Sequence, residues 1–189
     1  MSADRLERAF ASTAAVLAKV NAEQFDDPTP CASWRVRDLI NHVVGGTTFF
    51  AVTAETGTSP GRGSQPTDFT VGDYRASYQQ GAQRAVTAFR AEGAMDALMS
   101  VPFGQLPGSV FVNIAATDAF VHGWDLAKAT GQSTDLDPEL AGQLLASAQR
   151  SFPDTMRGDD GKAPFGAPVE VAESAAAADR LAGFLGRQP

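Results

Sequence analysis

The sequence predicts an all-α protein built as a helical bundle. Four long stretches repeat apolar residues at the i, i+3, i+4, i+7 spacing of one helix face, and almost no stretch alternates apolar and polar residues as a half-buried strand would. Clusters of Pro and Gly separate these stretches, as expected of connections between helices. Hydrophobic residues make up 43% of the 189 residues, enough for a packed core. We therefore expect a single domain over residues 1–189.

Two of the long helices fall in the first third of the chain. The first is predicted over residues 4–20, whose apolar face holds Leu6, Ala9, Phe10, Thr13, Val16, Leu17 and Val20. The two prolines of residues 26–30 end this pattern, because proline and the residue before it disfavour helix. The second is predicted over residues 36–54, where Asp38 suits the positive start of a helix.

The remaining helices follow after turn-rich connections. Two long patterns cover residues 70–91 and 109–129, and two shorter ones cover residues 138–150 and 174–185. The segments between these helices are rich in Gly and Pro and are predicted to be irregular: 57–68, 93–108 and 153–168. The chain thus reads as a four-helix bundle followed by short C-terminal helices.

Composition excludes several classes of function. The single cysteine, Cys31, forms neither an internal disulfide nor a multi-cysteine zinc site. The 15 basic and 22 acidic residues give a net charge of −7 without a basic cluster, which argues against nucleic-acid binding. No stretch holds the ~20 consecutive apolar residues of a membrane span, and the charged start of the chain is unlike a signal peptide. We therefore expect a cytoplasmic protein.

Two candidate metal ligands lie on the core face of the 109–129 helix. Asp118 and His122 are four residues apart, so they stack one turn above the other, in line with apolar neighbours. A buried carboxylate needs a partner charge, a hydrogen bond or a metal ion. The pair can supply two ligands to one ion, although the same spacing also suits a simple ion pair.

The other histidine, His42, lies in the middle of the 36–54 helix, at the flank of its apolar face. Gly46 follows it by one turn, in a Gly45-Gly46 pair that costs about 1 kcal/mol per glycine relative to alanine. The missing side chain of Gly46 would leave room for a ligand or substrate beside the imidazole. If the two helices are neighbours, His42 meets Asp118 and His122, and such a triad leaves coordination positions open, as in catalytic sites. The alternative is that His42 is a hydrogen-bonded core histidine.

Two blocks of sequence stand out as a pair, TPCASWRVRDLINHV at residues 29–43 and TDAFVHGWDLA at residues 117–127. They resemble the DinB-like superfamily of metalloenzymes, and within it the actinobacterial proteins related to the N-terminal domain of mycothiol-dependent maleylpyruvate isomerase. The tail DRLAGFLGR at residues 179–187 is similar to the C-terminal signature of a short subgroup of these proteins. The resemblance implies a DinB-like antiparallel four-helix bundle with one long crossover connection.

The same resemblance implies a divalent metal held by His42, Asp118 and His122, usually zinc and sometimes nickel. The sequence departs from the isomerase in two respects. The isomerase has a further C-terminal domain that contributes to its active site, whereas only about sixty residues follow the 109–129 helix here. The acidic ligand is also the shorter Asp instead of Glu. The first departure argues against isomerase activity itself, and the second requires a closer helix or gives a weaker metal site.

Two further side chains are candidates for the surroundings of the metal. Asp125 follows His122 by three residues. Its carboxylate can accept a hydrogen bond from the imidazole nitrogen of His122 that does not bind the metal. A role in helix packing is equally consistent with that position. Cys31 precedes the 36–54 helix and can approach the metal or a thiol co-substrate, or fill a small buried space.

The leading functional hypothesis is a metal-dependent enzyme of low-molecular-weight thiol chemistry, such as thiol S-transfer or thiol-assisted isomerisation. The resemblance makes mycothiol the expected thiol, and coordination would stabilise its nucleophilic thiolate. The expected partners are therefore a small-molecule thiol and an electrophilic substrate, with a homodimer left open. Two alternatives remain: a metal-dependent hydrolase, for which no separate general base is evident, and a non-enzymatic metal-binding module.

Overall fold

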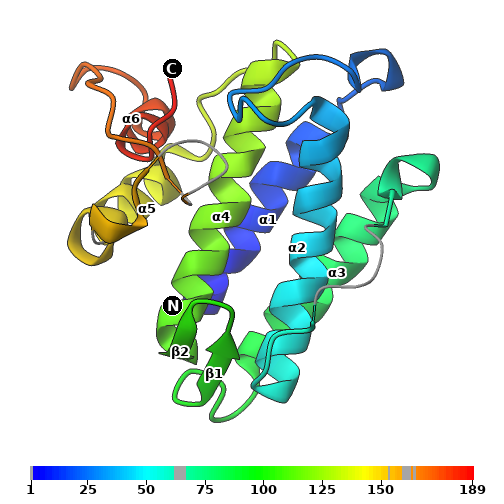
Figure 1. The fold of residues 1–189 in the computed structure, drawn as a ribbon, viewed down its shortest axis with the longest axis vertical. Helices are drawn as coiled ribbons and strands as arrows, with labels where there is room; N and C mark the ends of the chain where they lie inside the picture. The colour runs from blue at the N-terminus through cyan, green and yellow to red at the C-terminus, as the bar shows by residue number, and fades with distance from the viewer. Residues whose placement is uncertain (1, 62–66, 153, 159–162, 164) are drawn as a thin grey trace.

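Four long helices lie side by side as a bundle in the computed structural model, which describes residues 2–61, 67–152, 154–158, 163 and 165–189 (Figure 1). They are α1 (Ser2–Leu17), α2 (Val36–Thr56), α3 (Tyr74–Arg90) and α4 (Gly108–Ala129). Helices α1 and α4 run in one direction, and α2 and α3 run in the opposite direction (Figure 1). The connection between the parallel helices α2 and α3 therefore returns along the length of the bundle. This arrangement confirms the predicted bundle with one long crossover.

Each bundle helix buries the apolar face that the sequence spacing predicted, and its ends lie within a few residues of the predicted ones. The largest fully buried side chains come from all four helices, among them Leu6, Leu17, Leu39, Ile40, Tyr78, Phe89, Phe111, Phe120 and Trp124. The start of α2 is fixed by Asp38, whose carboxylate accepts a hydrogen bond from the backbone N–H of Arg35 at 2.9 Å. None of the described helices is long and apolar enough to cross a membrane.

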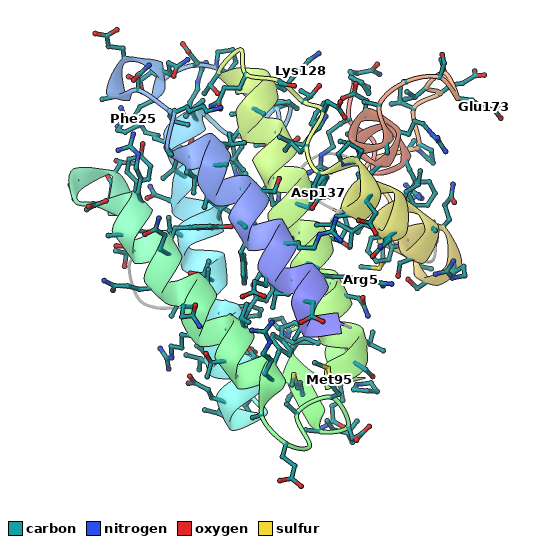
Figure 2. The ribbon with its side chains drawn as sticks, turned by 180° about the vertical axis from the view of Figure 1, so that it is seen from behind. Arg5, Phe25, Met95, Lys128, Asp137 and Glu173 are labelled. Atoms are coloured by element: carbon teal, nitrogen blue, oxygen red, sulfur yellow. The ribbon has the colours of Figure 1, made fainter. Side chains whose placement is uncertain are left out.

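Two shorter helices, α5 (Pro138–Ser151) and α6 (Ala177–Phe184), pack together against the α1 and α4 side of the bundle (Figure 1). Asp137, labelled in Figure 2, begins α5. It forms an ion pair of 2.6 Å with Arg8 of α1. The Nε1–H of Trp124 on α4 donates to Asp179 of α6 at 2.8 Å. These contacts confirm the predicted C-terminal helices and hold them on the bundle. Within the described ranges, three single 3-10 turns complete the helical elements: η1 (Ala22–Gln24), η2 (Phe69–Val71) and η3 (Asp154–Met156).

The segment 93–108, predicted to be irregular, contains a small β-hairpin instead. Strand β1 (Leu98–Val101) pairs antiparallel with β2 (Gly104–Pro107), with Leu98 opposite Pro107. Four residues per strand are too few for a recognisable alternating pattern among the surrounding prolines and glycines. Gly104 begins β2 with a φ of 133°, which favours glycine because other residues rarely adopt it. The predicted loops 57–68 and 153–168 include residues outside the described ranges, namely 62–66, 153, 159–162 and 164.

Helix α4 approaches α1 closely at Gly123. The hydroxyl of Thr13 on α1 packs against this glycine and donates to the carbonyl of Ala119 at 2.7 Å. A Cβ atom at position 123 would overlap with Thr13 Oγ1, so only glycine allows the two backbones to lie this close. Gly81 of α3 faces Thr47 of α2 in the same way. The α1–α4 pair and the α2–α3 pair therefore each depend on a glycine opposite a threonine.

Substitution of Gly123 by alanine tests this close approach. We expect Gly123→Ala to lower the free energy of unfolding by about 1–3 kcal/mol, because the added methyl group forces α1 and α4 apart. Gly142→Ala is the matched control on α5, where a Cβ atom would meet nothing within 4 Å. This control should be neutral or stabilising by up to ~1 kcal/mol. Denaturant unfolding measures both, and a Gly123→Ala variant as stable as the wild type would contradict the packing described.

Candidate metal centre

The three predicted metal ligands converge between α2 and α4. His42 Nε2 lies 3.7 Å from Asp118 Oδ1, and His122 Nε2 lies 3.6 Å from the same oxygen. All three donor atoms lie within 4.8 Å of one another. Two ligands of a tetrahedral zinc ion, each bound at about 2.0–2.2 Å, are roughly 3.3–3.6 Å apart. The two N–O separations are therefore close to what one shared ion requires.

The imidazole of His42 supplies a second indication of a ligand position. Its Nε2 atom is buried and has no hydrogen-bond partner among the described residues, since Asp118 is too far away for a hydrogen bond. A buried polar nitrogen without a partner is costly. The ring packs against Trp34 at 4.6 Å and against His122 at 4.6 Å between centroids, which fixes its orientation. Metal ligation would satisfy the nitrogen without moving the ring.

The imidazole of His122 is oriented by Asp125. Its Nδ1 lies 2.9 Å from Asp125 Oδ2, one turn further along α4. A carboxylate accepts hydrogen bonds only, so Nδ1 carries the proton and the lone pair lies on Nε2, which faces Asp118. Asp125 thus takes the place expected for it from the sequence, and it selects the tautomer of His122 that can bind a metal.

Asp125 also receives hydrogen bonds from two residues that are distant in sequence. Arg187, near the C-terminus, donates through Nε to Oδ1 at 3.3 Å and through Nη2 to Oδ2 at 3.1 Å. The thiol of Cys31 donates to Oδ2 at 3.3 Å. Arg187 Nη2 lies 3.7 Å from the Cys31 sulfur. Cys31 therefore lies beside Asp125, the hydrogen-bond partner of His122.

The electrostatics of the site favour ionised carboxylates. Burial by itself would raise the pKa of Asp118, but the facing His122 and His42 outweigh it and lower that pKa from its ordinary value. For Asp125, burial is likewise outweighed by the hydrogen bond from His122 and the charge of Arg187, and the pKa is lowered. Burial would lower the pKa of His42, yet the Asp118 carboxylate outweighs it and raises that pKa. Asp118 is thus held in the anionic form that a cation requires.

A cavity of about 540 Å³ opens onto the three candidate ligands. Trp34 and Cys31 contribute to one wall, and the C-terminal segment contributes Leu185, Gly186 and Arg187 to another. Gly46 is not among the described residues that line this cavity, and a Cβ atom there would meet only Phe50, at an ordinary 3.7 Å. The structure therefore brings Cys31 and Asp125 to the site and leaves Gly46 outside the cavity.

A second group of possible ligands, Cys31, His122 and Asp125, also has donor atoms within 4.8 Å of one another. This group is less suited to a cation, because the Arg187 guanidinium already occupies both oxygens of Asp125. A metal ion there would meet that positive charge at close range. The His42, Asp118 and His122 group contains no such cation and includes the unpartnered nitrogen.

The fold and the site define a helical-bundle protein with a candidate metal centre of two histidines and one aspartate. Residues 6–127 match the model of the family described as Mycothiol maleylpyruvate isomerase N-terminal domain, and the chain belongs to this family. Two proteins of Mycobacterium tuberculosis, Uncharacterized protein MT0763 and Uncharacterized protein Rv0738, are each 42% identical to it over 181 residues. Each match covers 96% of this chain and 94% of the relative. The resemblance inferred from the two sequence blocks is thereby confirmed.

The bundle is also similar to two crystal structures, those of the mycothiol-dependent maleylpyruvate isomerase and of a histidine-to-alanine mutant of it. The TM-scores are 0.58 and 0.57, with 18% and 19% sequence identity. Each comparison covers 77% of this chain and 68% of the other. At these identities the similarity shows a shared fold.

Arg187 is the site residue that sequence reasoning did not select. It follows α6 and lies 62 positions from Asp125, in a tail without a periodic pattern that could predict its partner. The one available signal was the tail block at residues 179–187, which ends at this arginine. Trp34, which precedes α2, also belongs to the site, because its ring lies against those of His42 and His122.

Removal of single ligands tests the metal centre. We expect untagged protein to hold about one divalent ion per chain, and His42→Ala, Asp118→Asn and His122→Ala each to lose most of it, because three protein ligands are the minimum of such a site. Elemental analysis after gel filtration measures the metal content. Cys31→Ser is the matched control, since its sulfur belongs to the other group of possible ligands. Unchanged metal content in both histidine variants would exclude the site.

Proposed function

We propose that this protein is a metal-dependent enzyme that activates a low-molecular-weight thiol for reaction with an electrophilic substrate. The observation that carries the proposal is the convergence of His42, Asp118 and His122 on the wall of a cavity. Three protein ligands beside open space are typical of catalytic metal sites, whereas structural sites are closed by a fourth. The cavity volume of about 540 Å³ is within the range of small-molecule sites.

Mycothiol is the thiol that we propose. The family to which the chain belongs is named for mycothiol, and the crystal structures that share its fold are of a mycothiol-dependent enzyme. The cavity combines the candidate ligands with the apolar side chains of Val121, Phe165 and Leu185, so it suits a small molecule that has both polar and apolar parts. The same cavity would admit the electrophile next to the thiol.

The residues of the site have two roles: some would bind the metal, and others orient the side chains that bind it. His42 and His122 offer Nε2 and Asp118 offers a carboxylate oxygen, a donor set that suits zinc and also nickel. A divalent ion bound there would lower the pKa of a thiol and stabilise its thiolate. Asp125 keeps His122 in the ligating tautomer, and Trp34 packs on both imidazoles and limits their motion. The cavity then aligns the thiolate sulfur with the electrophile.

An activity assay tests the proposed reaction. Untagged, zinc-loaded protein is mixed with mycothiol and a chromogenic electrophile, and we expect turnover. The turnover should disappear when a chelator removes the metal and return when zinc is added. His42→Ala and Asp118→Asn should fall to the uncatalysed rate, because they lose the metal that stabilises the thiolate. Cys31→Ser is the control for reaction through the protein's own thiol, and it should retain turnover.

The outcomes of this assay separate the alternatives. Turnover of an ester or amide that needs the metal but no thiol would replace the proposal by a metal-dependent hydrolase. Metal binding without turnover across a panel of electrophiles would support a non-enzymatic module. Turnover that is independent of the metal would overturn the proposed role of His42, Asp118 and His122.

A further inference from the structure

The C-terminal segment inserts the side chain of Arg187 beside the candidate metal centre. Arg187 is only 9% exposed although it lies two residues from the end of the chain. Its guanidinium makes four hydrogen bonds to three partners. Nε and Nη2 donate to the carboxylate of Asp125, Nη2 also donates to the Cys31 sulfur at 3.7 Å, and Nη1 donates to the carbonyl of Leu185 at 3.0 Å. This is a fixed, two-pronged contact with Asp125, and not the loose pairing of a surface arginine.

Packing of the preceding residues fixes the place of this arginine. Leu185 is fully buried, and Gly186 adopts a φ of 89°, which favours glycine. Gly186 packs against the backbone of Gly166 so closely that a Cβ atom would lie 2.6 Å from Gly166 Cα. The N–H of Arg187 itself donates to the carbonyl of Ala182 at 2.9 Å. The backbone that carries Arg187 is therefore held to α6 and to the segment around residue 166.

The buried carboxylate of Asp125 depends on the positive charge and hydrogen bonds of Arg187. Its side chain is completely buried on α4, so its charge has lost the stabilisation that water would provide. His122 and Cys31 each donate one hydrogen bond to Oδ2, and Oδ1 has Arg187 as its hydrogen-bond donor. Removal of one partner of a buried charge pair leaves the other uncompensated, which costs far more than loss of a surface pair. Without Arg187, the carboxylate that orients His122 is thus no longer held in place.

We propose that Arg187 is a positioning residue of the metal centre, acting through Asp125 on His122. It lies outside residues 6–127, the part of the chain that matches the family model. Metal binding at His42, Asp118 and His122 then depends on docking of the C-terminal segment, because that segment supplies the cation that fixes Asp125. The inference rests on the proposed function only in taking His122 as a metal ligand.

A purely structural role of Arg187 makes a different prediction. If the arginine served only to attach the tail to α4, its loss would lower the free energy of unfolding and leave the metal affinity of the folded protein unchanged. If it acts through Asp125, its loss weakens metal binding in protein that is still folded. Partners of a metal-ligating histidine typically contribute about 10–100-fold to metal affinity. The two roles are thus separated by a binding measurement.

The experiment is a double-mutant cycle on zinc affinity, with full-length untagged protein. Zinc dissociation constants are measured by competition with a chromophoric chelator, and folding is checked by circular dichroism, for Arg187→Met, Asp125→Asn and the double variant. We expect about 10–100-fold weaker binding in Arg187→Met and a similar loss in Asp125→Asn. The double variant should bind zinc no more weakly than Asp125→Asn does. Once Asp125 is changed, Arg187 no longer affects the orientation of His122, so its loss has no further effect on zinc affinity. Arg180→Met, at an exposed arginine of α6, is the matched control and should bind as the wild type does.

Arg187→Lys keeps the test open if Arg187→Met fails to fold. Lysine retains the positive charge but has no two-pronged fork, so we expect a loss of zinc affinity smaller than that of Arg187→Met and larger than that of Arg180→Met. The visible spectrum of bound Co²⁺ gives a second readout, and it should change in Arg187→Lys if the geometry of His122 changes.

The failures of the two proposals are distinguishable. A wild-type protein that binds no zinc would overturn the proposed function together with the role of Arg187. A wild-type protein that binds zinc, with unchanged affinity and an unchanged Co²⁺ spectrum in the Arg187 variants, would overturn the role of Arg187 alone. Losses from Arg187→Met and Asp125→Asn that add in full would likewise contradict an action through Asp125.

Discussion

A carboxylate removed from water must be compensated by its neighbours, and the arrangement of this site follows from that requirement at Asp125. His122 and Arg187 both donate hydrogen bonds to the Asp125 carboxylate. His122 lies on the same helix, whereas Arg187 comes from the C-terminal segment. The first contact sets the tautomer of a candidate metal ligand, and the second holds in place an arginine that lines the cavity. One buried charge thereby links the bundle, the tail and the metal centre.

Helical spacing was sufficient to predict the bundle and to place His42, Asp118 and His122, because a side chain's position on a helix follows from its residue number. The convergence of the two helices needed the resemblance as well, since spacing does not say which helices are neighbours. The hairpin at 98–107 escaped prediction because its strands are too short to carry a pattern. Arg187 escaped because a contact across 62 positions leaves no local signal.

Gly46 was interpreted as space for a ligand beside His42, and it is not among the described residues that line the cavity at the three candidate ligands. A Cβ atom at Gly45 would meet Phe69 at 3.8 Å and one at Gly46 would meet Phe50 at 3.7 Å, which are ordinary contacts. The close approaches of the bundle occur instead at Gly81 and Gly123. No residue of the C-terminal tail was selected for the site from the sequence. The tail nevertheless contributes Leu185, Gly186 and Arg187 to the cavity beside the candidate metal ligands.

The central claim is that one ion binds between α2 and α4, and a crystal structure of the zinc-loaded protein with anomalous scattering at the zinc edge tests it most directly. The account predicts a single strong anomalous peak about 2.0–2.2 Å from His42 Nε2, His122 Nε2 and an oxygen of Asp118, with Asp125 still bonded to His122. A peak at Cys31, His122 and Asp125, or no peak near His42 at full zinc occupancy in solution, would contradict it.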